Sequence, residues 1–165
     1  MTPGTLVLLH PPLARATTWG ALPATLRAAG LATVVPDVPD ATGMAYVARA
    51  SLEIAAADPA GPLVLVAQGE AGPLVPAIAL AQRAAHRGIG AYVFLDAALP
   101  RTPRLHDHDH EEPAVAVPPD WPEAPCGYLT TGEAPAQPVR EARLRGWPVQ
   151  EGTPAEALPA LITAL

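Results

Sequence analysis

The strongest constraint on the fold is a regular alternation between short apolar segments and longer segments that suit helices. Thr5–Leu9 is a nearly continuous apolar run, which is typical of a strand buried on both faces of a parallel sheet. Similar runs follow at 32–35, 63–67 and 91–95, and the segments between them predict helices at 19–29, 45–57 and 73–86. Strands joined by helices of this length form right-handed crossovers, so we expect a parallel sheet covered by helices on both faces.

The second half of the chain is less regular. Between 100 and 125 the sequence is rich in proline, histidine and acidic residues and has no periodic apolar face, which predicts an irregular loop. Strands at 127–130 and 147–149 and helices at 138–145 and 154–165 are predicted beyond it. We therefore predict one α/β domain over residues 1–165, a three-layer sandwich with a mostly parallel, doubly wound sheet. About six strands are expected, in the order second, first, third, fourth, fifth, sixth.

Several function classes are excluded by what the chain lacks. A net charge of -6 leaves no basic stripe for nucleic acid. No apolar run approaches the roughly 18 residues of a membrane span, and no basic stretch precedes the first strand, so we expect a cytoplasmic protein. A single cysteine, Cys126, excludes an internal disulfide and a cysteine-based zinc cluster. The sequence has no lysine, and therefore no Schiff-base anchor and no P-loop, and we expect no cofactor.

Three segments resemble the α/β-hydrolase family, in particular its small members common in actinomycetes. Leu8 to Leu13 is similar to the strand that runs into the oxyanion loop, which begins with His10-Pro11 here. The segment 65–72 resembles the nucleophile elbow, which usually reads Gly-His-Ser-x-Gly-Gly. The third segment, 92–100, is similar to the strand that follows the elbow.

The departures from this family change the expected chemistry. Gly69 stands where the elbow serine would be, and a glycine can hold the strained turn without supplying a nucleophile. The only serine, Ser51, falls inside the predicted helix at 45–57, and no histidine follows His110 where the triad histidine would lie. The loop that replaces the lid is also short. Because two triad members are missing, we expect no acyl-enzyme chemistry.

Three residues are candidates for catalysis. His10 follows the first strand at the edge where such folds bind ligands, although the resemblance also suits a structural role in orienting the loop. Asp96 ends the fourth strand at the same edge, where it is either a buried carboxylate or a turn cap. Glu70 follows the vacant serine position and is placed to act as an acid or base.

The ligand-binding site is expected at the same edge of the sheet. We predict that it is lined by Leu13, Trp19, Gly69 and Glu70. The N–H groups of Gly69 and Glu70 either bind an anion or polarise a carbonyl there, or simply close the turn.

The histidine-rich stretch 106–112 is the most conspicuous local feature. Its three alternating imidazoles would suit zinc, copper or nickel, but a proline-rich loop offers them no orienting partners. We therefore predict a solvated loop and no metal site. Glu133, in the usual place of the triad acid, is likewise expected to be solvated, and Cys126 to be a small core residue.

Two functions from different classes remain open. The first is a repurposed crevice that binds a small organic molecule and promotes a cofactor-free isomerisation, cyclisation or elimination in bacterial specialised metabolism. The second is a non-catalytic pseudoenzyme that binds a ligand, stabilises a protein partner, or forms a homodimer over the face without a lid. Residual hydrolysis through Cys126 or a metal-bound water ranks below both.

Overall fold

The computed structural model describes residues 4–101 and 115–165. Six strands form one parallel sheet in the order β2-β1-β3-β4-β5-β6, which confirms the predicted α/β class and strand order. The strands are β1 (Thr5–Leu9), β2 (Thr33–Val34), β3 (Leu63–Gln68), β4 (Ile89–Leu95), β5 (Cys126–Thr130) and β6 (Val149–Glu151). The central strands β1 and β3 pair over five residues, from Thr5 opposite Leu63 to Leu9 opposite Ala67.

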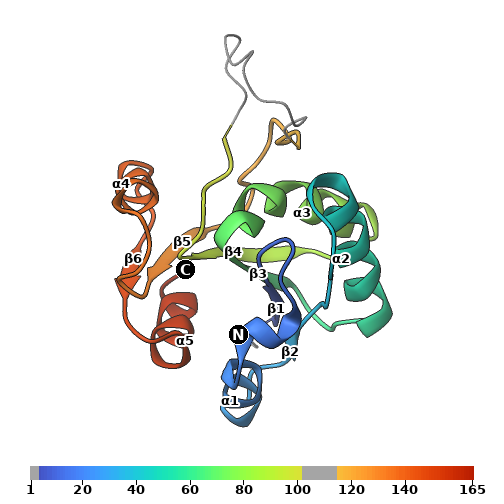
Figure 1. Ribbon diagram of the computed structural model, residues 1–165, viewed down its shortest axis with the longest axis horizontal. Helices are drawn as coiled ribbons and strands as arrows, with labels where there is room; N and C mark the ends of the chain where they lie inside the picture. Colours follow the sequence, from blue (N-terminus) through green and yellow to red (C-terminus); the bar gives the residue numbers. More distant parts are fainter. Residues whose placement is uncertain (1–3, 102–114) are drawn as a thin grey trace.

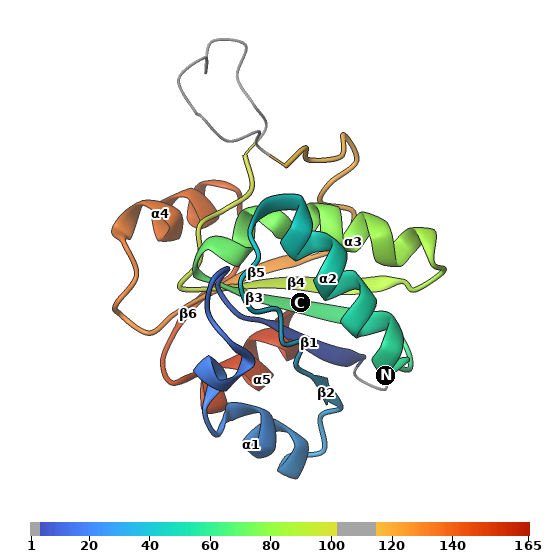
Figure 2. The ribbon, with the colours of Figure 1, turned by 45° about the vertical axis from the view of Figure 1, so that its right-hand side comes forward.

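Helices cover both faces of the sheet, as Figures 1 and 2 show. They are α1 (Leu22–Ala28), α2 (Gly43–Ala57), α3 (Val75–Ala84), α4 (Ala136–Leu144) and α5 (Pro154–Ala164). Side chains of a strand alternate between the faces, so Leu6 and Leu8 of β1 pack in the cluster of α1 and α5, whereas Val7 and Leu9 pack in the cluster of α2 and α3. This double burial explains why the strands are apolar at nearly every position.

Most element boundaries lie within two residues of the sequence-based prediction, and two of the differences have a clear cause in the backbone. Trp19 belongs to a short 3-10 helix, Ala16–Trp19, and not to the helix that follows. Gly20, with φ of 56° and ψ of -129°, breaks the chain direction, and α1 begins only at Leu22. The last strand lies two residues later than expected, because the carbonyl of Pro148 accepts from Tyr128 and regular pairing starts at Val149.

The segment 115–125 has no helix or strand, as predicted, and it is tied to the sheet by side chains. Trp121 contacts the rings of Phe94 and Trp147, with centroid separations of 6.3 and 6.2 Å. The Tyr92 hydroxyl donates to Glu123 over 2.5 Å. This part of the chain therefore packs on the face of β4 that carries Tyr92 and Phe94, and it leads into the start of β5.

No helix of the described residues is long and apolar enough to cross a membrane.

Candidate functional site

The turn between β3 and the next helix has the geometry of an elbow. Gly69 has a φ of +58°, a conformation that favours glycine, and it opens the 3-10 helix Gly69–Leu74, which continues into α3. A Cβ at Gly69 would lie 3.2 Å from Cγ of Pro11, in the loop after β1. The N–H groups of Gly69 and Glu70 precede the first intrahelical hydrogen bond, so the turn presents backbone donors at the carboxyl edge of the sheet.

A second glycine fixes the position of this turn against β4. A Cβ at Gly72 would lie 1.8 Å from the carbonyl oxygen of Ala98, so only glycine fits at this approach. The Ala98 N–H donates to the Gly69 carbonyl over 3.1 Å. The elbow and the segment after β4 are therefore locked together by their backbones.

His10 is fully buried beneath the loop after β1. Its Nε2 accepts from the Val38 N–H over 2.9 Å, which places the proton on Nδ1, and Nδ1 donates to the Pro11 carbonyl over 2.7 Å. Its own carbonyl accepts from the Tyr46 hydroxyl over 2.6 Å. Because both ring nitrogens are engaged, the geometry gives His10 the structural role and not the catalytic one.

The same loop is fastened to the segment after β2 by an ion pair. Arg15 donates to Asp37 over 2.8 Å, and the Ala16 N–H donates to the same carboxylate over 2.9 Å. The hydrogen bond from Arg15 lowers the pKa of Asp37 to about 2. Leu13, at the tip of the loop, has a φ of 66° and a side chain that is 70% exposed.

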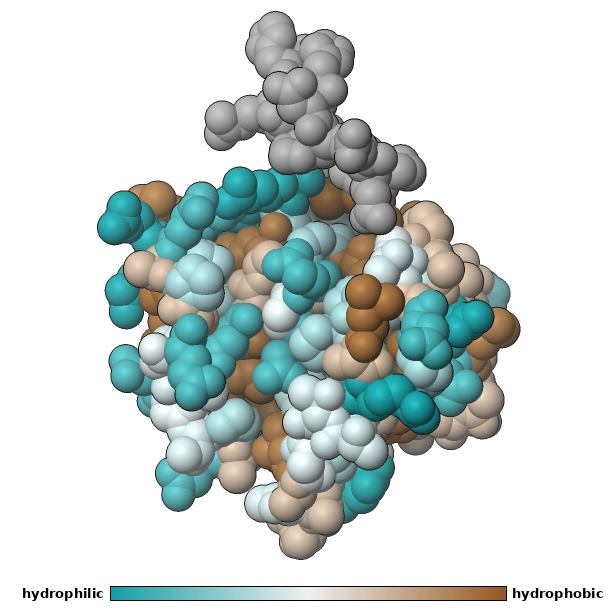
Figure 3. Space-filling view, in the orientation of Figure 1, coloured by the Kyte–Doolittle hydropathy of each residue, from teal (hydrophilic) through white to brown (hydrophobic). Residues whose placement is uncertain are grey.

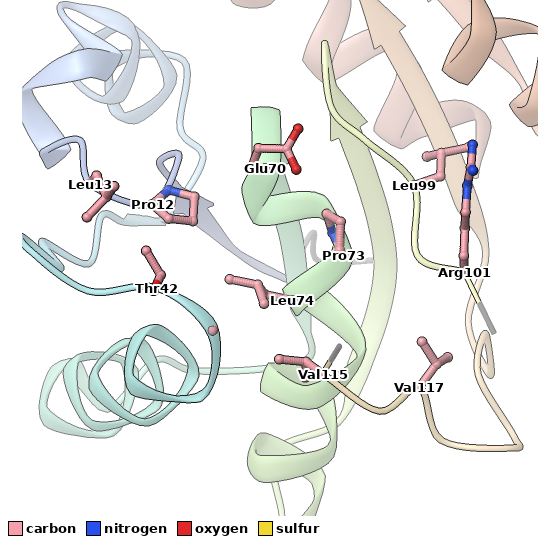
Figure 4. Close-up of a pocket in the computed structure, with 11 residues that line it drawn as sticks. Pro12, Leu13, Thr42, Glu70, Pro73, Leu74, Leu99, Arg101, Val115 and Val117 are labelled. Carbon is pink, nitrogen blue, oxygen red and sulfur yellow. The ribbon is translucent and has the colours of Figure 1, made fainter. Parts of the chain in front are cut away.

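An open crevice of about 510 Å³ lies above the elbow, between these loops (Figure 4). Leu13 and Thr42 stand on one side, Leu99 and Arg101 on the opposite side, and Glu70, Pro73 and Leu74 come from the elbow helix between them. Val115 and Val117 complete the wall. The crevice thus combines apolar walls with a carboxylate, a guanidinium and a hydroxyl, as small-molecule pockets do.

Only two of the four predicted ligand-binding residues line this crevice. They are Leu13 and Glu70. Gly69 supplies the turn, while Trp19 packs in the cluster of α1 and α5 and lines a different cavity. Arg101 and Thr42 were missed, because the walls combine segments far apart in sequence and nothing local marks either residue. Arg101 also contacts Glu141 of α4 at 3.4 Å.

Asp96 is placed near the edge of the sheet but is engaged by a neighbour. It has a φ of 44°, and its carboxylate accepts from the Thr131 N–H over 2.9 Å and from the Thr131 hydroxyl. These contacts join the ends of β4 and β5. Asp96 is therefore positioned as a turn cap, and it does not line the crevice that holds Glu70.

The remaining nucleophile candidates lie away from the crevice. Ser51 is on α2, where its hydroxyl donates to the Val47 carbonyl over 2.7 Å. Cys126 begins β5 with 5% of its surface exposed, and burial raises the pKa of its thiol to about 12. The thiol is therefore protonated at neutral pH and is a poor nucleophile.

The histidines 106, 108 and 110 lie outside the described residues. Within 4–101 and 115–165 no group of three potential ligands is arranged to hold a metal ion. Glu133 is exposed in the turn after β5.

Searches of family models and of curated proteins give no match to this sequence. Among solved structures, an extracellular α/β-hydrolase from a Paenibacillus species superposes with a TM-score of 0.69 at 16% identity, over 98% of this chain and 98% of that one. The pyrethroid hydrolase PytH superposes with a TM-score of 0.63 at 15% identity, over 99% of this chain and 96% of that one. The NocB thioesterase domain superposes with a TM-score of 0.60 at 19% identity, over 99% of this chain and 92% of that one.

Proposed function

The chain has an α/β-hydrolase fold, and we propose that it uses the crevice above the elbow to bind a small organic molecule and to promote a proton transfer without hydrolysis. The observation that carries this proposal is the placement of Glu70. Its carboxylate follows the elbow glycine directly and lines a crevice whose walls are mostly apolar. The position that presents a hydroxyl in the family's hydrolases has no side chain here.

The chemistry follows from the groups that line the crevice. A carboxylate accepts a proton from a carbon acid or an alcohol and returns it at another atom of the same molecule, which is an isomerisation or, with ring closure, a cyclisation. Loss of a leaving group after proton abstraction is an elimination. Arg101 and the elbow N–H groups supply positive potential for the charge that develops, and no cofactor is required in this scheme. A role in bacterial specialised metabolism would suit such a reaction.

The candidate residues in and near the crevice divide into groups that touch the ligand and groups that hold the surrounding loops in this proposal. Glu70 is the acid or base, and Leu13 holds the apolar part of the ligand. Asp96 is a positioning residue, since its carboxylate is occupied by Thr131. His10 holds the loop that carries Leu13, because its ring joins that loop to Val38.

The second candidate, a non-catalytic binder of a ligand or a protein partner, is favoured by one observation. Leu13 and Met44 are 70% and 60% exposed, and Met44 follows Gly43, which lines the crevice. On the face that Figure 3 shows, however, apolar residues are interspersed with polar ones and do not form one continuous patch. A small ligand therefore matches this surface better than a large protein interface.

The first experiment is native mass spectrometry of the protein purified gently from its own organism. A retained small molecule, lost in Val117→Asp, would place the ligand in the crevice. Conversion of that molecule should then fall by about 100-fold or more in Glu70→Gln. Glu53→Gln, an exposed acid on α2, is the matched control and should convert it normally.

Two outcomes would overturn the proposal. If Glu70→Gln converts the molecule at the normal rate, the carboxylate has no catalytic role. If a second protein is retained and the crevice is empty, the non-catalytic function holds instead.

A further inference from the structure

Residues 115–124, which we call the strap, join one wall of the crevice to contacts that lie well away from it. Val115 and Val117 line the crevice, and the strap then continues to the start of β5. The strap contains no helix or strand. Its one backbone hydrogen bond to described residues is the turn from the Trp121 N–H to the Pro118 carbonyl. Side chains therefore hold the strap against the rest of the molecule.

The last turn of α3 supplies one anchor for the strap. The Arg83 guanidinium donates to the Asp120 carboxylate over 2.8 Å and lies 3.7 Å from Oε2 of Glu123. Leu74, just before α3, lines the crevice, and Arg83 lies roughly 13 Å further along the helix axis. Arg83 itself does not line the crevice, so this anchor acts outside the ligand site.

Strand β4 supplies the second anchor. Tyr92 is fully buried, and its hydroxyl donates to Oε1 of Glu123 over 2.5 Å. The two oxygens of this carboxylate thus face different elements, one the tyrosine of β4 and the other the arginine of α3. The ring of Trp121 packs against those of Tyr92 and Phe94, with centroid separations of 5.7 and 6.3 Å. Polar contacts and an inserted ring therefore fix the same short stretch of the strap.

These anchors can be released without unfolding the sheet. The Asp120 side chain is 52% exposed, and an exposed ion pair contributes little to global stability. Salt screens such a pair further. Since the strap shares no strand ladder with the sheet, it can detach in a local opening while the strands remain paired.

We propose that Arg83, Tyr92 and Glu123 form a salt-sensitive latch that holds one wall of the crevice in place. They are positioning residues, because they act on Val115 and Val117 through the strap and do not touch the ligand. Release of the latch moves that wall as a unit, so the latch controls how wide a ligand the crevice accepts. The inference rests on the proposed function only in taking the crevice as the binding site; the latch itself is a property of the free protein.

The test follows the free protein by NMR. The indole N–H of Trp121 reports on the latch, and the methyl groups of Val117 report on the wall. The protein has three tryptophans, so Trp→Phe variants assign the three indole signals. Nε1 of Trp121 is buried, and its hydrogen should exchange with solvent about twofold to fivefold faster in Arg83→Gln, as the loss of one exposed ion pair allows. The Val117 methyl signals should shift in the same variant, whereas Trp19, in the cluster on the opposite face of the sheet, should be unchanged.

Three further variants define the latch. Tyr92→Phe removes only the hydroxyl and should speed exchange of the Trp121 N–H by about tenfold or more, because the lost acceptor is a carboxylate. Arg83→Lys keeps the positive charge and should retain most of the protection. Arg87→Gln is the matched control, since Arg87 pairs with Asp58 at 3.4 Å and should leave the strap unchanged.

Sodium chloride separates an ionic latch from a merely structural role of Arg83. Raising its concentration from about 0.05 to about 0.5 M should speed exchange of the Trp121 N–H in the unmodified protein. The same change should have little further effect in Arg83→Gln, because the screened pair is already absent. The Trp19 signal corrects for the effect of salt on exchange itself.

The latch is overturned if the Val117 signals stay in place in both Arg83→Gln and Tyr92→Phe, or if neither variant speeds exchange of the Trp121 N–H. Equal effects of Arg83→Gln and Arg87→Gln would also overturn it, as would equal sensitivity to salt with and without Arg83. Loss of protection that spreads to the amides of β3 would show global unfolding in place of a local opening and would contradict the latch. Glu70→Gln should leave every one of these signals unchanged, so failure of the latch and failure of proton transfer are distinguishable.

Discussion

At Gly69 the backbone has a φ of +58°, a region in which a residue with a Cβ costs about 1–2 kcal/mol. The α/β-hydrolase elbow normally accepts that cost in order to present its nucleophile. Here the turn is kept by glycine and by the contact of Gly72 with the Ala98 carbonyl, and the side chain is absent. The geometry of the turn is thus a property of the backbone, independent of the group that an elbow ordinarily displays.

Placing a serine at the elbow should not produce hydrolysis. Gly69→Ser is expected to lose about 1–2 kcal/mol of unfolding free energy, because of the positive φ and the approach of Pro11 at 3.2 Å. Of the two histidines that the structure describes, His10 has both nitrogens engaged and His86 is exposed beyond α3. Urea unfolding measures the stability, and a panel of nitrophenyl esters measures the activity.

Gly30→Ser is the matched control for this variant. Gly30 has a φ of +86°, and a Cβ added there would meet nothing within 4 Å, so this position reports the backbone cost alone. Ester turnover by Gly69→Ser that a fluorophosphonate abolishes would show that a working base is present after all.

At the scale of the elements, strands that are buried on both faces of the sheet could be predicted most accurately from the sequence. β1 and β3 were predicted within one residue, since a run such as Leu63–Ala67 must be buried on both faces and suits only a central strand. Trp19 was assigned to the wrong helix, because the break at Gly20 depends on a backbone angle that the apolar pattern does not encode. Arg101 lines the crevice only because segments far apart in the sequence meet there, so no local pattern could have indicated it.

The loop after β1 should loosen when its anchor is removed. In Asp37→Asn the Ala16 N–H loses the charged acceptor that lies 2.9 Å away. Its amide hydrogen should therefore exchange with solvent several times faster, while the amides of β1 remain protected from exchange. The pKa of Asp37 is lowered to about 2, so the anchor is present above pH 4 and is lost as the pH falls through about 2. Asp40→Asn, on the same segment, is the control. Equal exchange rates of the Ala16 amide in the two variants would contradict the anchoring role of Asp37.

At the scale of the whole molecule, the core holds every tyrosine of the chain. Tyr46, Tyr92 and Tyr128 are fully buried, and burial raises the pKa of each, to about 12 for Tyr128. Burial likewise raises the pKa of the Cys126 thiol, to about 12. The folded state therefore holds protons that the unfolded state releases above about pH 9, and folding stability should fall as the pH rises from there toward 12.

An alkaline titration checks this directly. Tyrosinate absorbance should stay absent from the folded protein near pH 10 and should appear only together with loss of the circular dichroism signal. The same protein in concentrated urea should titrate near the ordinary value of about 10. Tyrosinate forming near pH 10 while the fold persists would show that the tyrosines are accessible.

The strand order also has a consequence for synthesis of the chain. The strands β2, β1, β3 and β4 are neighbours in the sheet, so they can pair as soon as β4 has emerged from the ribosome. The next partner, β5, ends at Thr130, roughly 35 residues beyond the end of β4, a delay of about 2–7 s at usual translation rates. Throughout that interval the apolar edge of β4 has no neighbour. The nascent chain is thus most vulnerable to aggregation after its central sheet has formed, and a chaperone that acts on this protein would be needed at that moment.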